Sequence, residues 1–204
     1  MSDLAVDFKE QVTEARRTQI LMGAAQVFAK KGFHRATTKE IARAAGVAEG
    51  TIYNYFDSKR ELLLAMIQTL ATQTLQNAIQ DNPPDDPKVF LRMVMLDRVN
   101  LAQSHGQIIA PLLAEVFSDA VLREEIYHRI AMPLAALVEN YIERQIAAGV
   151  FRPVNPVVVT RALMGAMMIN IGILLTGMDE RYEEISPQTL VDELVSLVIN
   201  GLLT

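Results

Sequence analysis

Apolar side chains recur every three or four residues along almost the whole chain. No stretch alternates between apolar and polar positions for long enough to indicate a strand. The pattern therefore predicts an all-α fold of about nine helices. We expect them near residues 11–31, 38–45, 49–56, 59–81, 88–104, 107–117, 119–148, 156–177 and from 187 onward, after a flexible tail of residues 1–10.

Glycines and prolines mark the expected helix ends. Helices stop readily at glycine because it adopts a left-handed backbone, and proline is favoured in the first turn. The stops are Gly32, Gly46, Gly149 and Gly177, and the starts are Pro87, Pro156 and Pro187. Pro133 lies inside an expected helix and predicts a bend there, because it removes one backbone hydrogen bond.

Residues 37–61 read as two short helices joined by a glycine turn, followed by the start of a third helix. Thr37 and Glu40 have the spacing of a capping box, in which each side chain binds the other's backbone N–H. Ser58 and Glu61 have the same spacing, and Gly46 supplies the turn. The pattern predicts a helix-turn-helix, whose second helix enters the major groove of DNA.

The second short helix has two different faces. Ile52 and Phe56 are four residues apart and are expected to point inward, whereas polar and amphipathic side chains occupy the other face. Hydroxyl, amide and ammonium groups suit base edges and phosphates. The DNA-binding candidates are Thr37, Thr38, Lys39, Gly50, Thr51, Tyr53, Asn54, Tyr55 and Lys59. The alternative is an ordinary solvated helix face.

The segments Ala24–Ala42 and Gly46–Leu62 together resemble the signature of the tetracycline-repressor (TetR) family of transcription regulators. The resemblance implies a DNA-binding domain over residues 1–61 and a variable effector-binding and dimerisation domain over residues 62–204. Two positions depart from the family pattern. Ala48 replaces a frequent capping serine, and Glu49 places a negative charge beside the expected DNA surface.

The charge distribution supports a DNA-binding N-terminal segment although the net charge of the chain is −5. Residues 16–60 hold nine Lys or Arg and three Asp or Glu, whereas residues 61–204 hold nine basic and seventeen acidic residues. A basic segment attached to an acidic remainder is typical of a DNA-binding protein with a separate second role.

The longest apolar run, Ala162–Thr176, is shorter than the roughly 20 residues that cross a membrane. We therefore expect a buried or dimer-interface helix, with no membrane partner. The candidates for the homodimer interface are Gly165, Ala166, Ile169, Gly172, Leu190, Leu194, Leu197 and Val198. The alternative is that these residues belong to the core of one chain.

The remaining chain is rich in methionine and carries a few polar residues inside apolar stretches. Methionine adapts to irregular pockets, and a buried polar group needs a partner that a ligand could provide. The effector-binding candidates are Met66, Met93, Asn100, His105, Met132, Asn140, Met164, Met168 and Asn170, for a small apolar or amphipathic effector. For each of them, plain core packing is the alternative.

The sequence offers little for catalysis. It has no cysteine, only three histidines, and neither a phosphate-binding glycine loop nor a nucleophile elbow, so we expect no enzyme activity, no cofactor and no metal. The N-terminus does not read as a signal peptide, which suits the cytoplasm. The leading hypothesis is a repressor that an effector releases from a palindromic double-stranded operator. An activator, a regulator without an effector, and a helical enzyme or lipid carrier remain alternatives.

Overall fold

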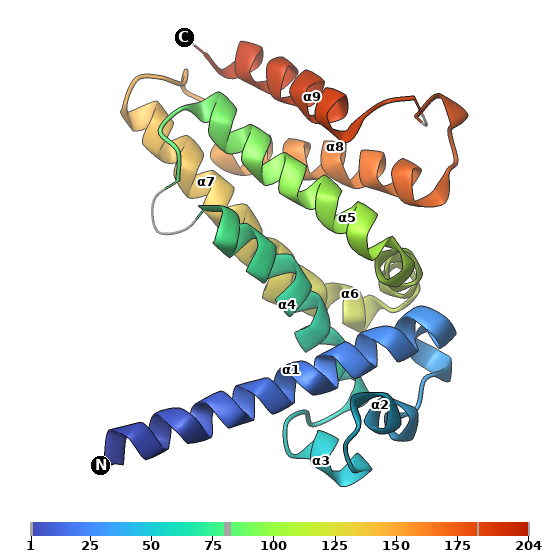
Figure 1. Cartoon of the computed structure of the whole chain (residues 1–204). Coiled ribbons are helices and arrows are strands. Elements are labelled where there is room, and N and C mark those ends of the chain that lie inside the picture. Colours follow the sequence, from blue (N-terminus) through green and yellow to red (C-terminus); the bar gives the residue numbers. More distant parts are fainter. Residues whose placement is uncertain (1, 80–82, 183, 204) are drawn as a thin grey trace.

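The computed structural model describes the backbone of residues 2–79, 83–182 and 184–203, and within these ranges it is all-α (Figure 1). The helices are α1 Ser2–Arg35, α2 Thr38–Ala45, α3 Glu49–Tyr53, α4 Lys59–Ile79, α5 Pro87–Ser118, α6 Ala120–Ile126, α7 Met132–Ala147, α8 Pro156–Thr176 and α9 Pro187–Leu202. A π-helical turn, Tyr127–Ala131, joins α6 to α7, and a 3₁₀ turn, Glu180–Tyr182, precedes α9.

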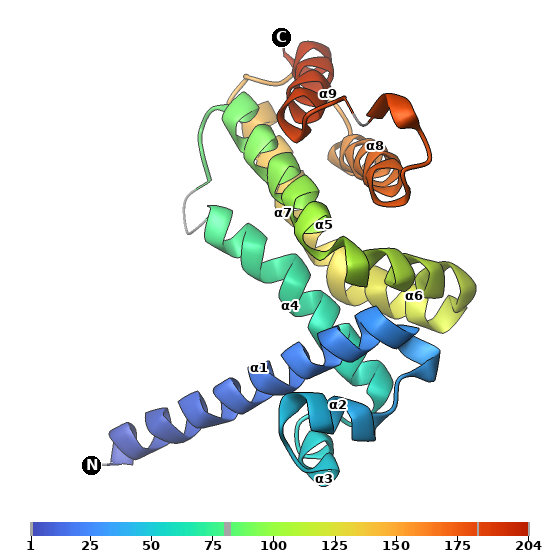
Figure 2. The same ribbon diagram turned by 45° about the vertical axis from the view of Figure 1, so that its right-hand side comes forward.

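The described side chains form two hydrophobic cores, one at each end of the molecule (Figures 1 and 2). The head core joins α1, α2 and α3 to the first half of α4 and includes Ile20, Phe28, Ile52 and Phe56. The body core joins α5, α7, α8 and α9 and includes Phe90, Tyr141 and Val195. Below, "head" means α1 to α3 together with the first turn of α4, and "body" means the rest of α4 together with α5 to α9.

The ring of Tyr141 fixes one end of the body core. It stacks on Phe90 with centroids 3.8 Å apart, and its hydroxyl donates to the carbonyls of Pro84 and Asp85 at 3.1 Å. Burial, with smaller contributions from the charges of Asp86 and Asp85, raises the pKa of Tyr141 to about 12. The hydroxyl therefore stays protonated and keeps the loop before α5 attached to α7.

Most helix ends form through the side chains that predict them. Asp86, Asn155 and Ser186 each accept a backbone N–H at the start of α5, α8 and α9, and a proline follows each of them. Gly46 ends α2 with φ 65° and Gly177 ends α8 with φ 61°, the left-handed backbone that glycine adopts without strain. The predicted starts of α5, α8 and α9 are thus confirmed.

Two helix boundaries differ from the sequence prediction. The backbone of α1 is helical from Ser2, so residues 2–10 belong to a helix and not to the predicted flexible tail. Gly32 nevertheless breaks the regular part with φ 73° and ψ 166°. The α3 helix ends at Tyr53 and not at Phe56, and the N–H groups of Asn54 and Tyr55 bond three residues back, to the carbonyls of Thr51 and Ile52. The predicted end of the fourth helix, near residue 81, lies outside the described residues.

Two predicted interruptions take a different form in the structure. The helices expected over 88–104 and 107–117 form one helix, α5, with a kink at His105 (φ −125°, ψ 19°). The bend expected at Pro133 is a π-helical turn just before it, in which the N–H of Met132 donates to the carbonyl of Tyr127, five residues earlier. The proline has no N–H for the carbonyl of Arg129, so the α-helical pattern cannot continue there.

Candidate nucleic-acid interface and ligand pocket

A close contact with α1 fixes the position of α2. Gly23 of α1 lies directly against Ala45, because a Cβ on Gly23 would stand 2.7 Å from the Ala45 backbone nitrogen. The Gln19 side chain donates to the carbonyl of Ala45 at 2.6 Å, which satisfies one of the last carbonyls of α2. The predicted capping box at the other end of α2 is confirmed, since Thr37 and Glu40 bind each other's backbone N–H.

The α3 helix presents its polar face away from the head core. Ile52 and Phe56 are buried in that core, as predicted. Tyr53 is 52% exposed, and Asn54 and Gly50 are also exposed. Thr51 and Tyr55 are half-buried, and Tyr55 packs partly against the head core. The exposed part of the predicted reading face is therefore narrow and consists mainly of Tyr53, Asn54 and Gly50.

A chain of hydroxyl groups links α3 to α2 at this surface. The Tyr53 hydroxyl donates to Thr38 Oγ1 at 3.3 Å, and the Thr38 hydroxyl donates to the Glu49 carboxylate at 2.6 Å. Glu49 stands in the first turn of α3, where no side chain caps the helix after Ala48. The carboxylate suits the helix dipole there and also orients Thr38, which in turn orients Tyr53.

The Lys59 side chain is half-buried, and its ammonium bonds to backbone carbonyls of the head. It donates to the carbonyls of Phe33, His34 and Ala36 at 2.7, 3.3 and 3.0 Å and stands 4.5 Å from the centre of the Phe33 ring. Burial lowers its pKa, partly offset by the charge of Glu115. Lys59 thus holds the α1–α2 connection in place, and a contact with DNA phosphate stays a prediction. Lys39 and Thr37, by contrast, are exposed at the start of α2.

Charged side chains connect the head to the body. The Arg60 guanidinium donates to Asp119 at 2.7 Å and approaches Glu125 at 3.5 Å, and His34 lies 2.6 Å from the Glu115 carboxylate. Bonding from the Leu122 backbone N–H, and then the charge of Arg60, lower the pKa of Asp119. These contacts tie the head to the C-terminal half of α5 and to α6.

The second predicted capping box forms only in part. The Ser58 hydroxyl accepts from the Glu61 N–H at 3.0 Å, as expected. The Glu61 carboxylate does not return to Ser58, because both of its oxygens accept from Arg129 of the body. The sequence could not indicate this partner, which lies far away along the chain.

An apolar cavity of about 240 Å³ lies in the body between α5, α7 and α8. Its lining residues are Leu91, Val94, Met95, Arg98, Leu134, Ala135, Val138, Thr160, Leu163, Met164, Met167, Met168 and Ile171. Two of the predicted effector residues, Met164 and Met168, line it. Thr160 and Arg98 are lining residues that the sequence pattern did not indicate, although Thr160 precedes Leu163 and Met164 by one helical turn.

The other predicted effector residues lie elsewhere. Met66 is buried in the head core, Asn100 and Met132 are exposed, and Met93 packs against the body core. The Asn170 side chain is buried but already paired, because it donates to the Ala166 carbonyl at 2.7 Å and accepts from Tyr182. These positions do not join Met164 and Met168 in one cavity.

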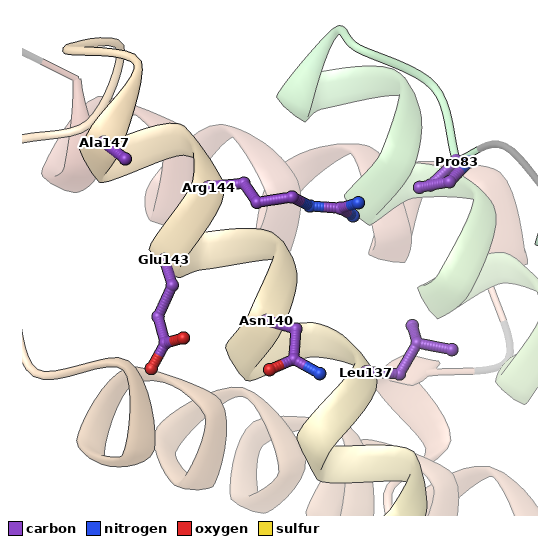
Figure 3. Close-up of a pocket in the computed structure, with 6 residues that line it drawn as sticks. All are labelled: Pro83, Leu137, Asn140, Glu143, Arg144 and Ala147. Carbon is purple, nitrogen blue, oxygen red and sulfur yellow. The ribbon is translucent and has the colours of Figure 1, made fainter.

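Asn140 and His105 line two further hollows. Asn140 stands with Leu137 and Arg144 on an open face of α7, near Pro83 (Figure 3). His105 lies at the α5 kink in an open cleft against α1, and its Nδ1 atom is buried without a hydrogen-bond partner among the described residues. Neither hollow has the almost wholly apolar lining of the cavity at Met164.

The predicted dimer residues divide into two groups. Ile169 and Leu197 are 62% and 71% exposed, and Gly165 is also exposed. Leu190 is buried in the body core, whereas Ala166, Gly172, Leu194 and Val198 are half-buried. The α8 helix is also, among the described residues, the one helix long and apolar enough to cross a membrane, and little of it is buried within the protomer. Large apolar side chains of α8 and α9 thus remain uncovered in one protomer.

Comparisons with known proteins agree with the helix-turn-helix geometry. Residues 20–66 match the sequence profile described as bacterial regulatory proteins, tetR family. The fatty acid metabolism regulator protein of Bacillus subtilis is 24% identical over 186 residues, which cover 90% of this chain and 94% of that protein.

Two solved structures show the same fold. A TetR-family transcriptional regulator from Rhodococcus has a TM-score of 0.76 at 19% identity, covering 93% of this chain and 98% of the other. The regulator FadR of Bacillus subtilis in complex with stearoyl-CoA has a TM-score of 0.77 at 21% identity, covering 90% and 98%. At this identity the likeness shows the fold alone.

The fold and the exposed face of α3 define the class as a helix-turn-helix DNA-binding protein. The chain carries, over residues 20–66, the DNA-binding domain of the TetR family of transcriptional regulators, and its fold is that of solved TetR-family proteins. It is therefore a transcription regulator and not an enzyme.

Proposed function

We propose that this protein is a homodimeric repressor that binds a palindromic operator through α3 and leaves it when a small apolar or amphipathic molecule enters the body cavity. The observation that carries the proposal is the face of α3. Tyr53 and Asn54 stand outward from a basic head while Ile52 and Phe56 fix the helix from behind. Amide and phenol groups in this position suit base edges and phosphates.

A homodimer suits both the uncovered apolar surface and the expected target. Ile169 on α8 and Leu197 on α9 expose large side chains that a second copy would cover. A palindromic operator needs two α3 helices about 34–36 Å apart. The DNA-binding residues named from the sequence, the division near residue 61 and a cytoplasmic location are parts of this proposal.

The cavity between α5, α7 and α8 supports an effector with an apolar chain. Its wall is almost entirely aliphatic and methionine side chains. The relative from Bacillus subtilis is a fatty acid metabolism regulator, and the FadR structure contains stearoyl-CoA. Met164, Met167 and Met168 add side chains that adapt to the shape of a chain.

The α5 helix supports a route from the cavity to the head. Leu91 and Met95, in its first half, line the cavity, whereas Ile108 and Val116, in its second half, pack against the head core. The kink at His105 separates the two halves. An effector that changes the angle at this kink would move Glu115 and, with it, the contact to His34 of the head.

The test begins with duplexes that the purified protein selects from a random library. Fluorescence anisotropy then measures their affinity as salt rises, and the affinity should fall steeply because phosphate contacts release counterions. Tyr53→Ala and Asn54→Ala should weaken binding about tenfold or more. Tyr127→Ala, which removes an exposed tyrosine of the body, should not. Equal affinity in all three variants would reject the α3 interface.

The effector part needs its own measurement. Stearoyl-CoA and free fatty acids are titrated into the protein–DNA complex, and release is followed by anisotropy. Val94→Phe, which fills the cavity from α5, should keep DNA binding and lose the response. A response that persists in this variant would place the effector elsewhere, and an absence of any response would favour a regulator without such an effector.

A further inference from the structure

Thr160 carries an unusual hydroxyl at the wall of the body cavity. The residue is 1% exposed, and its Oγ1 atom is buried without a hydrogen-bond partner among the described residues. A threonine inside a helix can usually place its hydroxyl on a carbonyl three or four residues earlier. Here the hydroxyl makes no such bond and instead forms part of the cavity lining.

A buried hydroxyl without a partner destabilises the protein that contains it. Valine has nearly the same shape and would fill this position without that cost. Leu163, Met164 and Met167, the neighbouring lining residues on α8, are all apolar. The hydroxyl at Thr160 therefore has no evident part in packing, and its hydrogen-bonding capacity is available to a molecule in the cavity.

The charges near the cavity disfavour a charged ligand group. Arg98 is the charged member of the lining, and its guanidinium is paired with Asp97 and donates to the Ala71 carbonyl at 2.8 Å. A carboxylate placed in the cavity would meet the Asp97 charge together with that of Arg98. Burying an anion without a dedicated cation is costly, whereas a neutral oxygen needs only the Thr160 hydroxyl.

We infer that the effector is an apolar chain bearing a neutral oxygen function, such as a ketone or ester carbonyl or a hydroxyl, and that Thr160 bonds to this oxygen and sets the specificity of the cavity. The inference rests on the proposed function, because it takes the cavity as the effector site. According to this inference, Thr160 alone decides which of several molecules with the same apolar chain binds more tightly in the cavity.

Straight-chain ketones of one chain length, with the carbonyl moved along the chain, provide the probes. An alkene of the same length is the apolar control, and a fatty acid of that length is the charged control. Calorimetry measures their affinity for the wild type and three variants. Thr160→Val removes the hydroxyl, and Thr160→Ser keeps it. Thr176→Val makes the same change on α8 at an exposed hydroxyl that already bonds to the Gly172 carbonyl.

One ketone should bind the wild type about fivefold more tightly than the alkene, the effect of one hydrogen bond of ordinary net strength. Thr160→Val should abolish this preference, and Thr160→Ser and Thr176→Val should retain it. Without ligand, Thr160→Val should melt at the same temperature as the wild type or higher. A merely structural Thr160 would not make the preference depend on the position of the carbonyl.

Two results would overturn the inference and leave the proposed function standing. The first is a ketone preference that survives in Thr160→Val while chain compounds still release DNA. The second is a fatty acid that binds more tightly than every ketone. If no chain compound binds the wild type or releases its DNA, the effector part of the proposed function fails, and this inference fails with it.

Discussion

Glu61 and Arg129 face each other across the junction of head and body and form two parallel hydrogen bonds of 2.7 and 2.8 Å. Glu61 stands in the first turn of α4, and Arg129 belongs to the π-helical turn before Pro133. The fork of the guanidinium matches both carboxylate oxygens, which fixes direction as well as distance. The pair therefore orients the start of α4, and with it the head, relative to α6 and α7.

Replacing Glu61 by glutamine should reduce stability in a pH-dependent way. Hydrogen bonding from Arg129 lowers the pKa of Glu61 below its ordinary value of 4.5. The unfolded state therefore binds the proton first as the pH falls, so the pair stabilises the fold fully above 4.5 and less as the pH falls through the lower, folded value. Both side chains are partly exposed, so the loss should be about 1 kcal/mol at neutral pH.

Urea unfolding between neutral and acidic pH checks this expectation. The difference between the wild type and Glu61→Gln should shrink towards zero in acid. Glu124→Gln removes the same charge from an exposed position on α6 and serves as the control, with a difference near zero throughout. A difference for Glu61→Gln that stays constant with pH would show that the carboxylate charge does not stabilise the junction.

Gly23 and Gly50 should respond in opposite ways to alanine. The new methyl at Gly23 would collide with the Ala45 backbone, so Gly23→Ala should cost about 1–3 kcal/mol by forcing α1 and α2 apart. Nothing lies within 4 Å of a Cβ at Gly50, so Gly50→Ala should melt like the wild type. It should still weaken DNA binding, because the methyl would stand on the exposed face of α3.

Thermal melting and anisotropy separate the two variants. If Gly50→Ala bound the selected duplex as well as the wild type, α3 would not approach DNA closely at that position. If Gly23→Ala melted unchanged, the contact of α1 with Ala45 would be looser than the structure indicates.

Local signals along the chain predicted the helix types and most of their ends. The caps at Asp86, Asn155 and Ser186 need only a side chain and its own backbone, so the sequence specifies them. The π-helical turn before Pro133 was predicted only as a bend, because proline indicates a lost bond but not the pattern that replaces it. Gly106 reads as a stop, and the structure has its interruption one residue earlier, as the kink at His105 inside α5. Gly106 itself lies against Leu175 of α8, where a Cβ would stand 2.7 Å from the leucine Cδ2.

The candidate site, too, could be predicted from the sequence only where it depends on a single helix. The outward face of α3 follows from helical spacing alone, so Tyr53 and Asn54 could be named from the sequence. The cavity depends on how α5, α7 and α8 pack, and spacing could not separate Met164 from Met66, which the head core buries. Thr160 had one usable signal, a hydroxyl one turn before a run of apolar residues.

Replacing Lys59 and replacing Lys39 by methionine should have different effects, one on stability and the other on DNA binding. Lys59→Met keeps the length of the side chain over Phe33 but leaves three carbonyls without their donor, so it should cost about 1–3 kcal/mol of stability. Lys39→Met removes an exposed charge from the start of α2, so it should melt like the wild type. It should weaken DNA binding uniformly across sequences and reduce the salt slope by about one.

Melting curves and salt titrations with the selected duplex check both changes. The structural role of Lys59 would be wrong if its variant melted normally and lost only DNA affinity. In that case the residue would contact phosphate, as the sequence analysis predicted.

Ile169→Glu should dissociate the proposed dimer into monomers. The side chain lies on α8 with 62% of its surface exposed, and Figure 2 shows α8 and α9 at the end of the molecule opposite α3. A glutamate there keeps the protomer folded, because it points to solvent, but buries a charge in the interface of a dimer. Sedimentation should therefore find monomers, with a melting transition for the protomer. The affinity for a palindromic duplex should fall about 100-fold or more, because the two heads no longer bind as one unit, whereas the affinity for a half-site should hardly change.

Val121→Glu, an equally drastic change at a 59% exposed residue of α6, should leave the dimer and its palindrome affinity intact. If Ile169→Glu stayed dimeric, the interface would have to lie on another surface, and the apolar face of α8 would need a different partner.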